Sequence, residues 1–203
     1  MAAGREGTWN RAARRYARQE RLECQAIRRA LKLAAPRPEE ELLDVATGTG
    51  LVLRELALRP GPPARAVGLD RSEAMLARVG ALPAGWCLVP GDATALPFPD
   101  ASFDVALCAY LLHVLEPEAS DAALAELRRV VRPGGRLVVV TVWTARTASS
   151  MLLAGLARVA PEAFIGLRPL DPRPALTRAG WTPARAAVLR EGYPSLIVLA
   201  RRG

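Results

Sequence analysis

Short apolar runs along the chain alternate with stretches in which apolar residues recur at helical spacing, and glycine or proline separates most of them. The clearest unit spans residues 41–57. Leu42, Leu43 and Val45 form a run too short for a helix, the turn 47–50 interrupts it, and leucines then resume at helical spacing. This pattern predicts a strand, a tight turn and a helix.

The same alternation continues to about residue 143. We predict further strands at residues 64–69, 86–89, 103–108 and 136–143, and a turn at residues 133–135 before the last of them. We also predict a helix over 120–131, and a helix that Ser72 caps and that carries Met75, Leu76 and Val79. Strands that alternate with helices favour a parallel sheet with right-handed crossovers, so the fold class is α/β. Beyond it we predict helices at 147–160 and 172–179, then an antiparallel hairpin of residues 184–190 and 195–201.

The segment before this sheet, residues 8–34, predicts one or two amphipathic helices. Apolar residues fall near one side and arginines occupy the others, and Pro36 and Pro38 end the run. Three interpretations stay open: a docking helix with a solvated basic face, a mobile lid over a ligand, or a surface that meets an anionic membrane. Tyr16 is the side chain of this segment that we assign to the candidate site.

Length and composition favour one domain in the cytoplasm. The chain has 203 residues and 51% hydrophobic content, which is enough to bury one full core. It contains no run of eighteen apolar residues, and its arginine-rich start lacks the apolar region of a signal peptide. The three cysteines, Cys24, Cys87 and Cys108, are odd in number and far apart, so we predict small buried residues, with Cys87 on a buried strand, and no metal site.

The net charge of +8 is concentrated near the start of the chain. Residues 1–35 hold nine basic and three acidic residues, which leaves the remainder close to neutral. This distribution disfavours a broad surface for nucleic acid.

Candidate chemistry lies in the turn after the first strand. Glycines at Gly48 and Gly50 let a ligand approach the backbone, and the following helix directs its free N–H groups at that ligand. Asp44 adds a carboxylate, which suits a ligand with a cationic group as well as hydroxyls. Asp70, which ends the second strand, stands where a doubly wound sheet binds ribose hydroxyls.

Five ordered motifs resemble the class I S-adenosylmethionine-dependent methyltransferases, and among them the ubiquinone/menaquinone-biosynthesis type. They lie at residues 43–50, 68–76, 91–105, 112–114 and 127–135, so that the resemblance covers about residues 40–143. It implies a Rossmann-like, seven-stranded mixed sheet with an antiparallel last strand and helices on both faces. In this reading residues 1–203 form one domain, divided into an N-terminal helical lid (1–38), a cofactor-binding core (41–143), and acceptor-side helices with a C-terminal hairpin (144–203).

The resemblance also implies S-adenosylmethionine as cofactor and S-adenosylhomocysteine as product. The residues implied to contact the cofactor are Asp44, Ala46, Thr47, Gly48, Gly50, Asp70, Arg71, Met75, Asp92, Ala93 and Cys108. The turn would pass beneath the methionine part, with Asp44 near its amino group and the Cys108 backbone at the same end. Asp70 would accept both ribose hydroxyls. Ala46 stands where the family usually has its first glycine, as it also does in quinone-type members.

For adenine, the resemblance implies Arg71 and Met75 on either side of the ring, with Asp92 at the exocyclic amine and the Ala93 amide at a ring nitrogen. An apolar slot with one polar end suits this base. His113, the only histidine, would lie near the methyl group as a base or as a residue that shapes the pocket. Methyl transfer needs mainly an in-line approach in a dry site, so no dedicated base is required.

These observations favour a methyltransferase that acts on a small-molecule or lipid-like acceptor, such as a quinone or phospholipid. The acceptor pocket would involve the N-terminal helix, the segment after His113 and residues 144–170, with Trp143, Met151, Leu152, Leu153, Leu156, Phe164 and Ile165 as apolar lining. Peripheral membrane contact is compatible with the basic helix, and the sequence carries no signal for an oligomeric state.

The alternatives are a cofactor-binding protein without transferase activity and an RNA methyltransferase that uses the basic N-terminus. Nucleic acid is disfavoured because Cys108–Leu111 differs from the Asn/Asp-Pro-Pro-Tyr signature of amino-group methylation. A nicotinamide oxidoreductase is disfavoured because Asp44 would repel a pyrophosphate.

Overall fold

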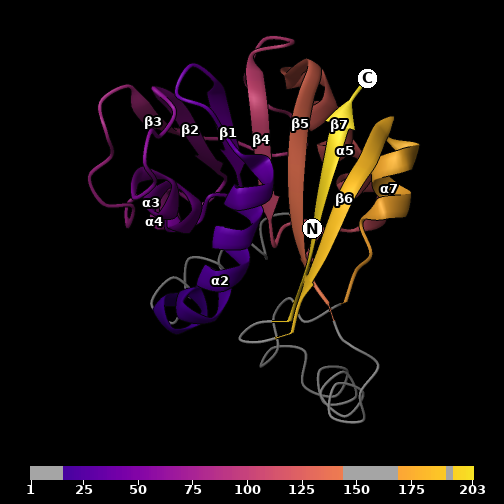
Figure 1. Cartoon of the computed structure of the whole chain (residues 1–203), viewed down its shortest axis with the longest axis horizontal. Coiled ribbons are helices and arrows are strands. Elements are labelled where there is room, and N and C mark those ends of the chain that lie inside the picture. Colours follow the sequence, from indigo (N-terminus) through magenta and orange to yellow (C-terminus); the bar gives the residue numbers. More distant parts are fainter. Residues whose placement is uncertain (1–15, 144–168, 191–193) are drawn as a thin grey trace.

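Seven strands form one mixed sheet in the computed structural model, which describes residues 16–143, 169–190 and 194–203. The strand order is β3-β2-β1-β4-β5-β7-β6 (Figure 1). The strands are β1 (Glu41–Val45), β2 (Arg65–Asp70), β3 (Trp86–Pro90), β4 (Phe103–Ala109), β5 (Val131–Val142), β6 (Trp181–Leu189) and β7 (Ser195–Arg202). The first five pair in parallel, and β7 is antiparallel to both β5 and β6. The predicted fold class, the antiparallel last strand and the C-terminal hairpin are confirmed.

Helices cover both faces of this sheet, as predicted. They are α2 (Tyr16–Ala34), α3 (Leu51–Ala57), α4 (Glu73–Leu76), α5 (Pro117–Val130) and α7 (Arg173–Arg178). The apolar sides of α2 and α3 pack on one face, and those of α5 and α7 pack on the other. Leu124 and Leu127 of α5 are fully buried, as their spacing predicted. The two faces therefore have separate apolar cores, with the sheet between them.

The long helix α2 is fixed to the start of α3 by polar contacts. Glu20 accepts hydrogen bonds from the Thr49 hydroxyl and from Arg54, and Glu55 accepts them from Arg28 and Cys24. In Figure 1, α2 extends beyond the lower ends of the central strands. Among the described helices, α2 included, none is both long and apolar enough to cross a membrane.

Several element boundaries differ from the prediction. Ser72 does cap α4, where its hydroxyl accepts from the Met75 amide, but the helix ends at Leu76. The strand predicted at 136–143 begins at Val131, because residues ahead of Arg136 already pair with the start of β4. A register shift accommodates the predicted turn there, and Gly134 has a φ of 77°. The helix predicted at 147–160 lies outside the described residues, as does Tyr193 in the hairpin turn.

The cysteines do not share the burial predicted for them. Cys87 is exposed, because β3 is the edge strand of the sheet, so the expectation of a buried position was wrong. Cys24 is half-buried and donates to Glu55, and only Cys108 is fully buried. Asp104 of β4 holds the start of β1: its carboxylate accepts from the Glu41 amide at 2.9 Å and from Arg132 at 2.6 Å.

Candidate functional site

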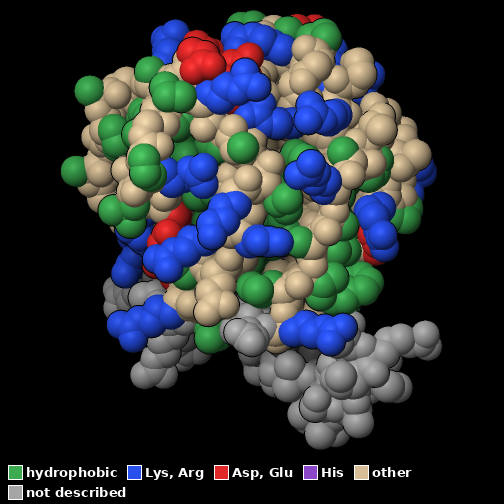
Figure 2. Space-filling model, in the orientation of Figure 1, with side chains coloured by type: hydrophobic (Ala, Val, Ile, Leu, Met, Phe, Trp, Pro, Cys, Tyr) green, Lys and Arg blue, Asp and Glu red, His purple; other side chains and the backbone are tan. Residues whose placement is uncertain are grey.

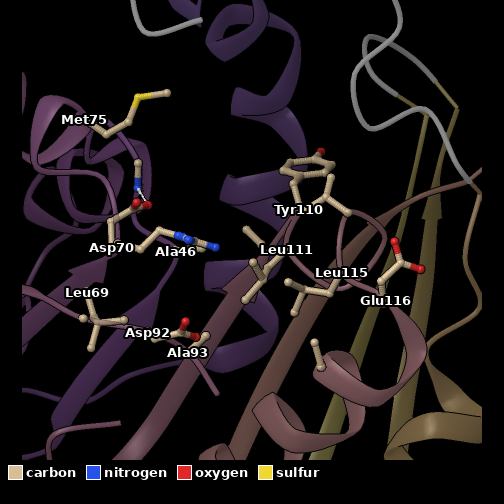
Figure 3. Close-up of a pocket in the computed structure, with 16 residues that line it drawn as sticks. Ala46, Leu69, Asp70, Met75, Asp92, Ala93, Tyr110, Leu111, Leu115 and Glu116 are labelled. Atoms are coloured by element: carbon tan, nitrogen blue, oxygen red, sulfur yellow. Dashed lines mark hydrogen bonds between the residues drawn. The ribbon is translucent and has the colours of Figure 1, made fainter. Parts of the chain in front are cut away.

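A pocket of about 350 Å³ opens at the carboxyl ends of β1, β2 and β4 (Figure 3). It lies where the strand order reverses, with β2 on one side of β1 and β4 on the other, which is the usual ligand position in an open α/β sheet. One half is lined by residues of β2 and α4 and of the segments that follow β1, β2 and β3: Ala46, Gly48, Leu69, Asp70, Arg71, Met75, Gly91, Asp92 and Ala93. Segments far apart in the sequence thus meet in one site.

Asp70 places a carboxylate at the floor of this half. Its Oδ2 accepts from the Gly48 amide and its Oδ1 from the Ser72 amide, each at 2.9 Å. Burial raises the pKa of Asp70, and the two amides oppose that rise. Each oxygen has a second lone pair, so the fixed carboxylate can accept further bonds from ligand hydroxyls.

The turn after β1 has three left-handed residues. Ala46 and Gly48 line the pocket with φ values of 60° and 56°. A left-handed backbone strains any residue with a Cβ atom, so Ala46 carries a strain that a glycine at this position would not. Gly50 has a φ of 81° and does not line the pocket; a Cβ atom there would lie 2.8 Å from Cγ1 of Val79.

We expect Gly50→Ala to destabilise the fold more than Gly48→Ala. An added Cβ meets nothing within 4 Å at Gly48, so the cost there is only left-handed strain, about 1 kcal/mol. At Gly50 the overlap with Val79 adds roughly 1–3 kcal/mol. Urea unfolding of the two variants measures the difference, and equal midpoints would show that Val79 yields without cost.

Asp44 lies beneath the pocket floor rather than on its surface. It is 1% exposed, and neither carboxylate oxygen has a hydrogen-bond partner among the described residues. Burial, with a smaller contribution from the Asp70 charge, raises the pKa of Asp44 to about 7, although the nearby Thr47 hydroxyl favours the charged form. A buried carboxylate without a partner is stabilised by a nearby cation. The site therefore suits a ligand that carries positive charge next to the turn.

The opposite corner of the same half combines apolar walls with one acid. Leu69 and Met75 line it and are nearly fully buried. Asp92 accepts from both the amide and the hydroxyl of Thr94 through Oδ1, at 2.8 Å each. The Thr94 amide is the main cause of a lowered Asp92 pKa, so this carboxylate is charged at neutral pH. A flat, apolar ring with a donor group at its edge would be accommodated here.

The second half of the pocket is mostly apolar. Its lining comes from the end of β4 and the segment that leads into α5: Ala109, Tyr110, Leu111, Val114, Leu115, Glu116 and Ala119. Tyr110 has a φ of 57°, and its hydroxyl lies 2.7 Å from the Ser195 hydroxyl at the start of β7. These constraints fix the tyrosine ring on the side of the second half, above Leu111 and Leu115 in the view of Figure 3.

Several predicted site residues do not line the pocket. His113 is 5% exposed and packs edge-on against Tyr110 with ring centroids 6.1 Å apart. Burial raises the pKa of the Cys108 thiol to about 12, so it stays neutral and is unsuited to covalent attack. Trp143 packs on the apolar core instead. The side chain of Tyr16 is outside the described part of the chain, as are the six lining residues predicted between 151 and 165.

The sequence predicted most of the residues that line the first half of the pocket and few of those that line the second. The predicted Ala46, Gly48, Asp70, Arg71, Met75, Asp92 and Ala93 line the pocket, whereas Asp44, Thr47, Gly50 and Cys108 lie behind it. The segment after His113 was predicted to face an acceptor, and it does line the second half. Tyr110 was missed as a lining residue; its place directly after a predicted strand was the available signal.

Comparison with known proteins agrees with this geometry. Residues 43–139 match the family described as "Methyltransferase domain". Demethylmenaquinone methyltransferase of Mycobacterium marinum is 36% identical over 88% of this chain and 81% of its own length. The chain belongs to the class I S-adenosylmethionine-dependent methyltransferases of UbiE type.

Other relatives of this methyltransferase match over a shorter region. The ubiquinone/menaquinone biosynthesis C-methyltransferase UbiE of Dinoroseobacter shibae is 45% identical over 52% of this chain, which spans only 44% of that relative. Magnesium protoporphyrin IX methyltransferase of Synechocystis, solved with bound S-adenosylhomocysteine, has a TM-score of 0.65 at 20% identity, covering 93% of this chain and 85% of its own. At that identity the likeness concerns the fold alone. The cofactor of the family is S-adenosylmethionine.

Proposed function

We propose that this methyltransferase transfers a methyl group to a ring carbon of a reduced quinone; its relatives are named for demethylmenaquinone and for ubiquinone/menaquinone biosynthesis. The observation that supports this acceptor class is the second half of the pocket, where apolar side chains predominate. A hydrophobic ring would displace water there, and a dry site favours attack on a charged methyl donor.

The first half of the pocket would hold the cofactor. Asp70 would accept the ribose hydroxyls, Arg71 and Met75 would flank the adenine, and Asp92 with the Ala93 amide would contact its edge. The turn from Ala46 through Thr47 and Gly48 to Gly50, with the Cys108 backbone, would surround the methionine part above Asp44. The bound cofactor supplies an electrophilic methyl group on a sulfonium, and the residues supply orientation and opposite charge.

His113 would act by orienting Tyr110 rather than as a base. It packs against the tyrosine and does not line the pocket. A methyl group that moves from the sulfonium to an activated ring carbon displaces the ring proton, which is lost to solvent after the C–C bond has formed, so the transfer depends mainly on in-line orientation. Tyr16, at the start of α2, stays a candidate for the acceptor side.

Methyl transfer can be tested directly with cofactor labelled in its methyl group. We expect label in a demethylmenaquinol analogue and none in a tRNA fraction, with product identified by mass spectrometry. Cofactor binding without transfer to any quinol would favour the alternative of a binding protein. Label in RNA would favour the alternative in which the basic N-terminus binds nucleic acid.

The chain would work in the cytoplasm and meet the membrane peripherally. Basic side chains prevail on the face that α2 covers (Figure 2). Arg21, Arg29 and Lys32 of α2 are exposed and form no ion pair within the described residues, and Leu22 beside them is 48% exposed. A basic surface with an apolar contact suits an anionic bilayer that carries a lipid-like acceptor.

We expect the chain to float with anionic vesicles and not with neutral ones. Replacing Arg21, Arg29 and Lys32 together with glutamine should abolish flotation, since each such residue contributes about 1 kcal/mol near an anionic surface. The same exchange at Arg65, Arg173 and Arg178, which form ion pairs on other elements, is the control. Equal flotation of both variants would remove the membrane contact from the proposal.

A further inference from the structure

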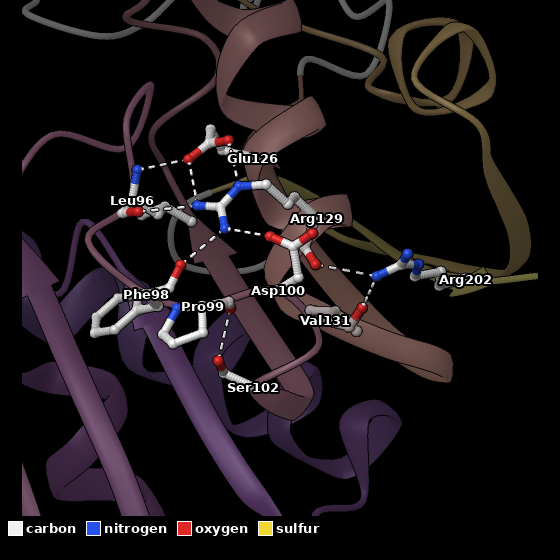
Figure 4. Close-up of polar contacts among 9 residues, drawn as sticks. All are labelled: Leu96, Phe98, Pro99, Asp100, Ser102, Glu126, Arg129, Val131 and Arg202. Atoms are coloured by element: carbon white, nitrogen blue, oxygen red, sulfur yellow. Dashed lines mark hydrogen bonds and ion pairs between the residues drawn. The ribbon is translucent and has the colours of Figure 1, made fainter.

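One guanidinium, that of Arg129 near the end of α5, uses all five of its N–H donors (Figure 4). Nε and Nη2 donate to the two oxygens of Glu126, each at 2.8 Å. Nη1 donates to the Phe98 carbonyl and to Asp100, and Nη2 donates to the Leu96 carbonyl, at 2.8 to 2.9 Å. Two carbonyls of one loop are thus held by one side chain.

The loop is bound to α5 through its amides as well. The Leu96 amide donates to Glu126 at 2.8 Å, so that both backbone groups of Leu96 are fixed by the Glu126 and Arg129 pair. The amides of Ala101 and Ser102 donate to the carbonyls of Arg129 and Val130. Residues 96–102 therefore have little freedom relative to the helix.

This loop begins at the pocket. Asp92 accepts from both Thr94 groups, and the Ala95 amide donates to the Asp92 carbonyl at 3.1 Å. Leu96 is the next residue, and it is only 4% exposed because it belongs to the apolar core. The half-buried Ala93 packs against the same core. A short, internally bonded turn thus joins the anchored Leu96 to the two residues at the polar corner of the pocket.

The end of α5 is itself anchored to a strand of the sheet. Arg202, at the end of β7, donates to the carbonyls of Arg129 and Val131. The anchor of the loop is consequently part of the rigid sheet and helix framework. A rigid framework can hold a loop in one precise position, whereas an isolated ion pair on the surface cannot.

We propose that Arg129 is a positioning residue for cofactor recognition, which holds Asp92 and Ala93 at the edge of the adenine through the loop 94–100. This inference rests on the proposed contacts of Asp92 and Ala93, but not on the identity of the acceptor. Lysine in place of Arg129 keeps the charge but cannot bond Glu126, Asp100 and two carbonyls together.

Calorimetry with two probes tests this role: S-adenosylhomocysteine, and S-inosylhomocysteine, in which oxygen replaces the exocyclic amine. We expect the wild type to prefer the adenosyl compound by about tenfold, the effect of a charged hydrogen bond. Arg129→Lys and the milder Asp100→Asn should weaken adenosyl binding and reduce that preference, with little change for the inosyl compound. Arg128→Gln is the matched control, because the neighbouring Arg128 contacts the Gly180 carbonyl instead.

An equal loss for both probes would overturn the proposal, as would unchanged binding combined with a lower unfolding temperature, since either result describes a purely structural arginine. Failure of the wild type to methylate quinols would refute the proposed acceptor and leave the probe preference intact. The two ideas can therefore fail separately.

Discussion

Asp70→Ala should weaken binding of S-adenosylhomocysteine by about 10-fold to 150-fold, which corresponds to the roughly 1.5–3 kcal/mol of a hydrogen bond to a charged group. The carboxylate is fixed by the amides of Gly48 and Ser72, so it needs no reorganisation to accept ligand hydroxyls. Isothermal titration calorimetry at neutral pH measures the change. A ligand that lacks both ribose hydroxyls should bind the wild type and the variant about equally.

The matched control for Asp70 is Glu73→Ala. Glu73 is an exposed acid in the first turn of α4, three residues further along the chain. The Glu73→Ala substitution removes the same charge from the same neighbourhood, but Glu73 does not line the pocket. If both variants weakened binding equally, the effect of Asp70 would be long-range electrostatics rather than contact with the ribose.

Asp44 should make the ligand-free protein less stable as the pH rises. Its folded pKa of about 7 lies above the ordinary value of 3.8, so the folded state binds the proton more tightly than the unfolded state. The contribution of Asp44 to the free energy of unfolding is therefore fully present below about pH 4. It is lost as the pH rises from there through 7, and the total loss is roughly 4 kcal/mol at most. Asp44→Asn should remove this dependence and be the more stable protein at pH 8.

Denaturant unfolding at pH 5.5 and pH 8 measures this difference. Parallel pH profiles for the wild type and Asp44→Asn would show that Asp44 does not titrate in this range. Cofactor binding should instead become stronger as the pH rises. Burial disfavours the charged form of Asp44 in the ligand-free site, whereas a cationic ligand favours it. Wild-type affinity for S-adenosylhomocysteine, which keeps the ammonium group, should rise from pH 6 to pH 8, and that of Asp44→Asn should stay flat.

The sequence was informative wherever a local pattern decides the structure. Alternation of strands and helices located β1 to β4 within one or two residues, and Asp70 was found because it ends a predicted strand. Asp92 was implied by the family resemblance, and it lies two residues after the end of β3. Parallel strands bring their carboxyl ends to one edge of the sheet, so such residues must lie near one another. This part of the site follows from topology alone.

The remainder depends on packing that no local pattern records. Asp44 was predicted near the amino group of the ligand, and its position in the motif did not reveal that it is only 1% exposed. Gly50 was predicted as a cofactor contact; it does not line the pocket, and a Cβ atom there would lie against Val79. Cys87 was predicted to be buried because its neighbours in the sequence are apolar. It is exposed because the strand order places β3 at the edge of the sheet. Three of the five bonds of Arg129 reach a loop about thirty residues earlier in the chain, and charge pattern alone does not select this arginine from the others on the chain.

The bond between Tyr110 and Ser195 links the wall of the second half of the pocket, where we propose that the acceptor binds, to a strand 85 residues further along the chain. Ser195 is completely buried and opens the antiparallel strand that lies between two others. Acceptor preference can therefore diverge during evolution through substitutions in the C-terminal hairpin, while every residue that faces the substrate stays the same.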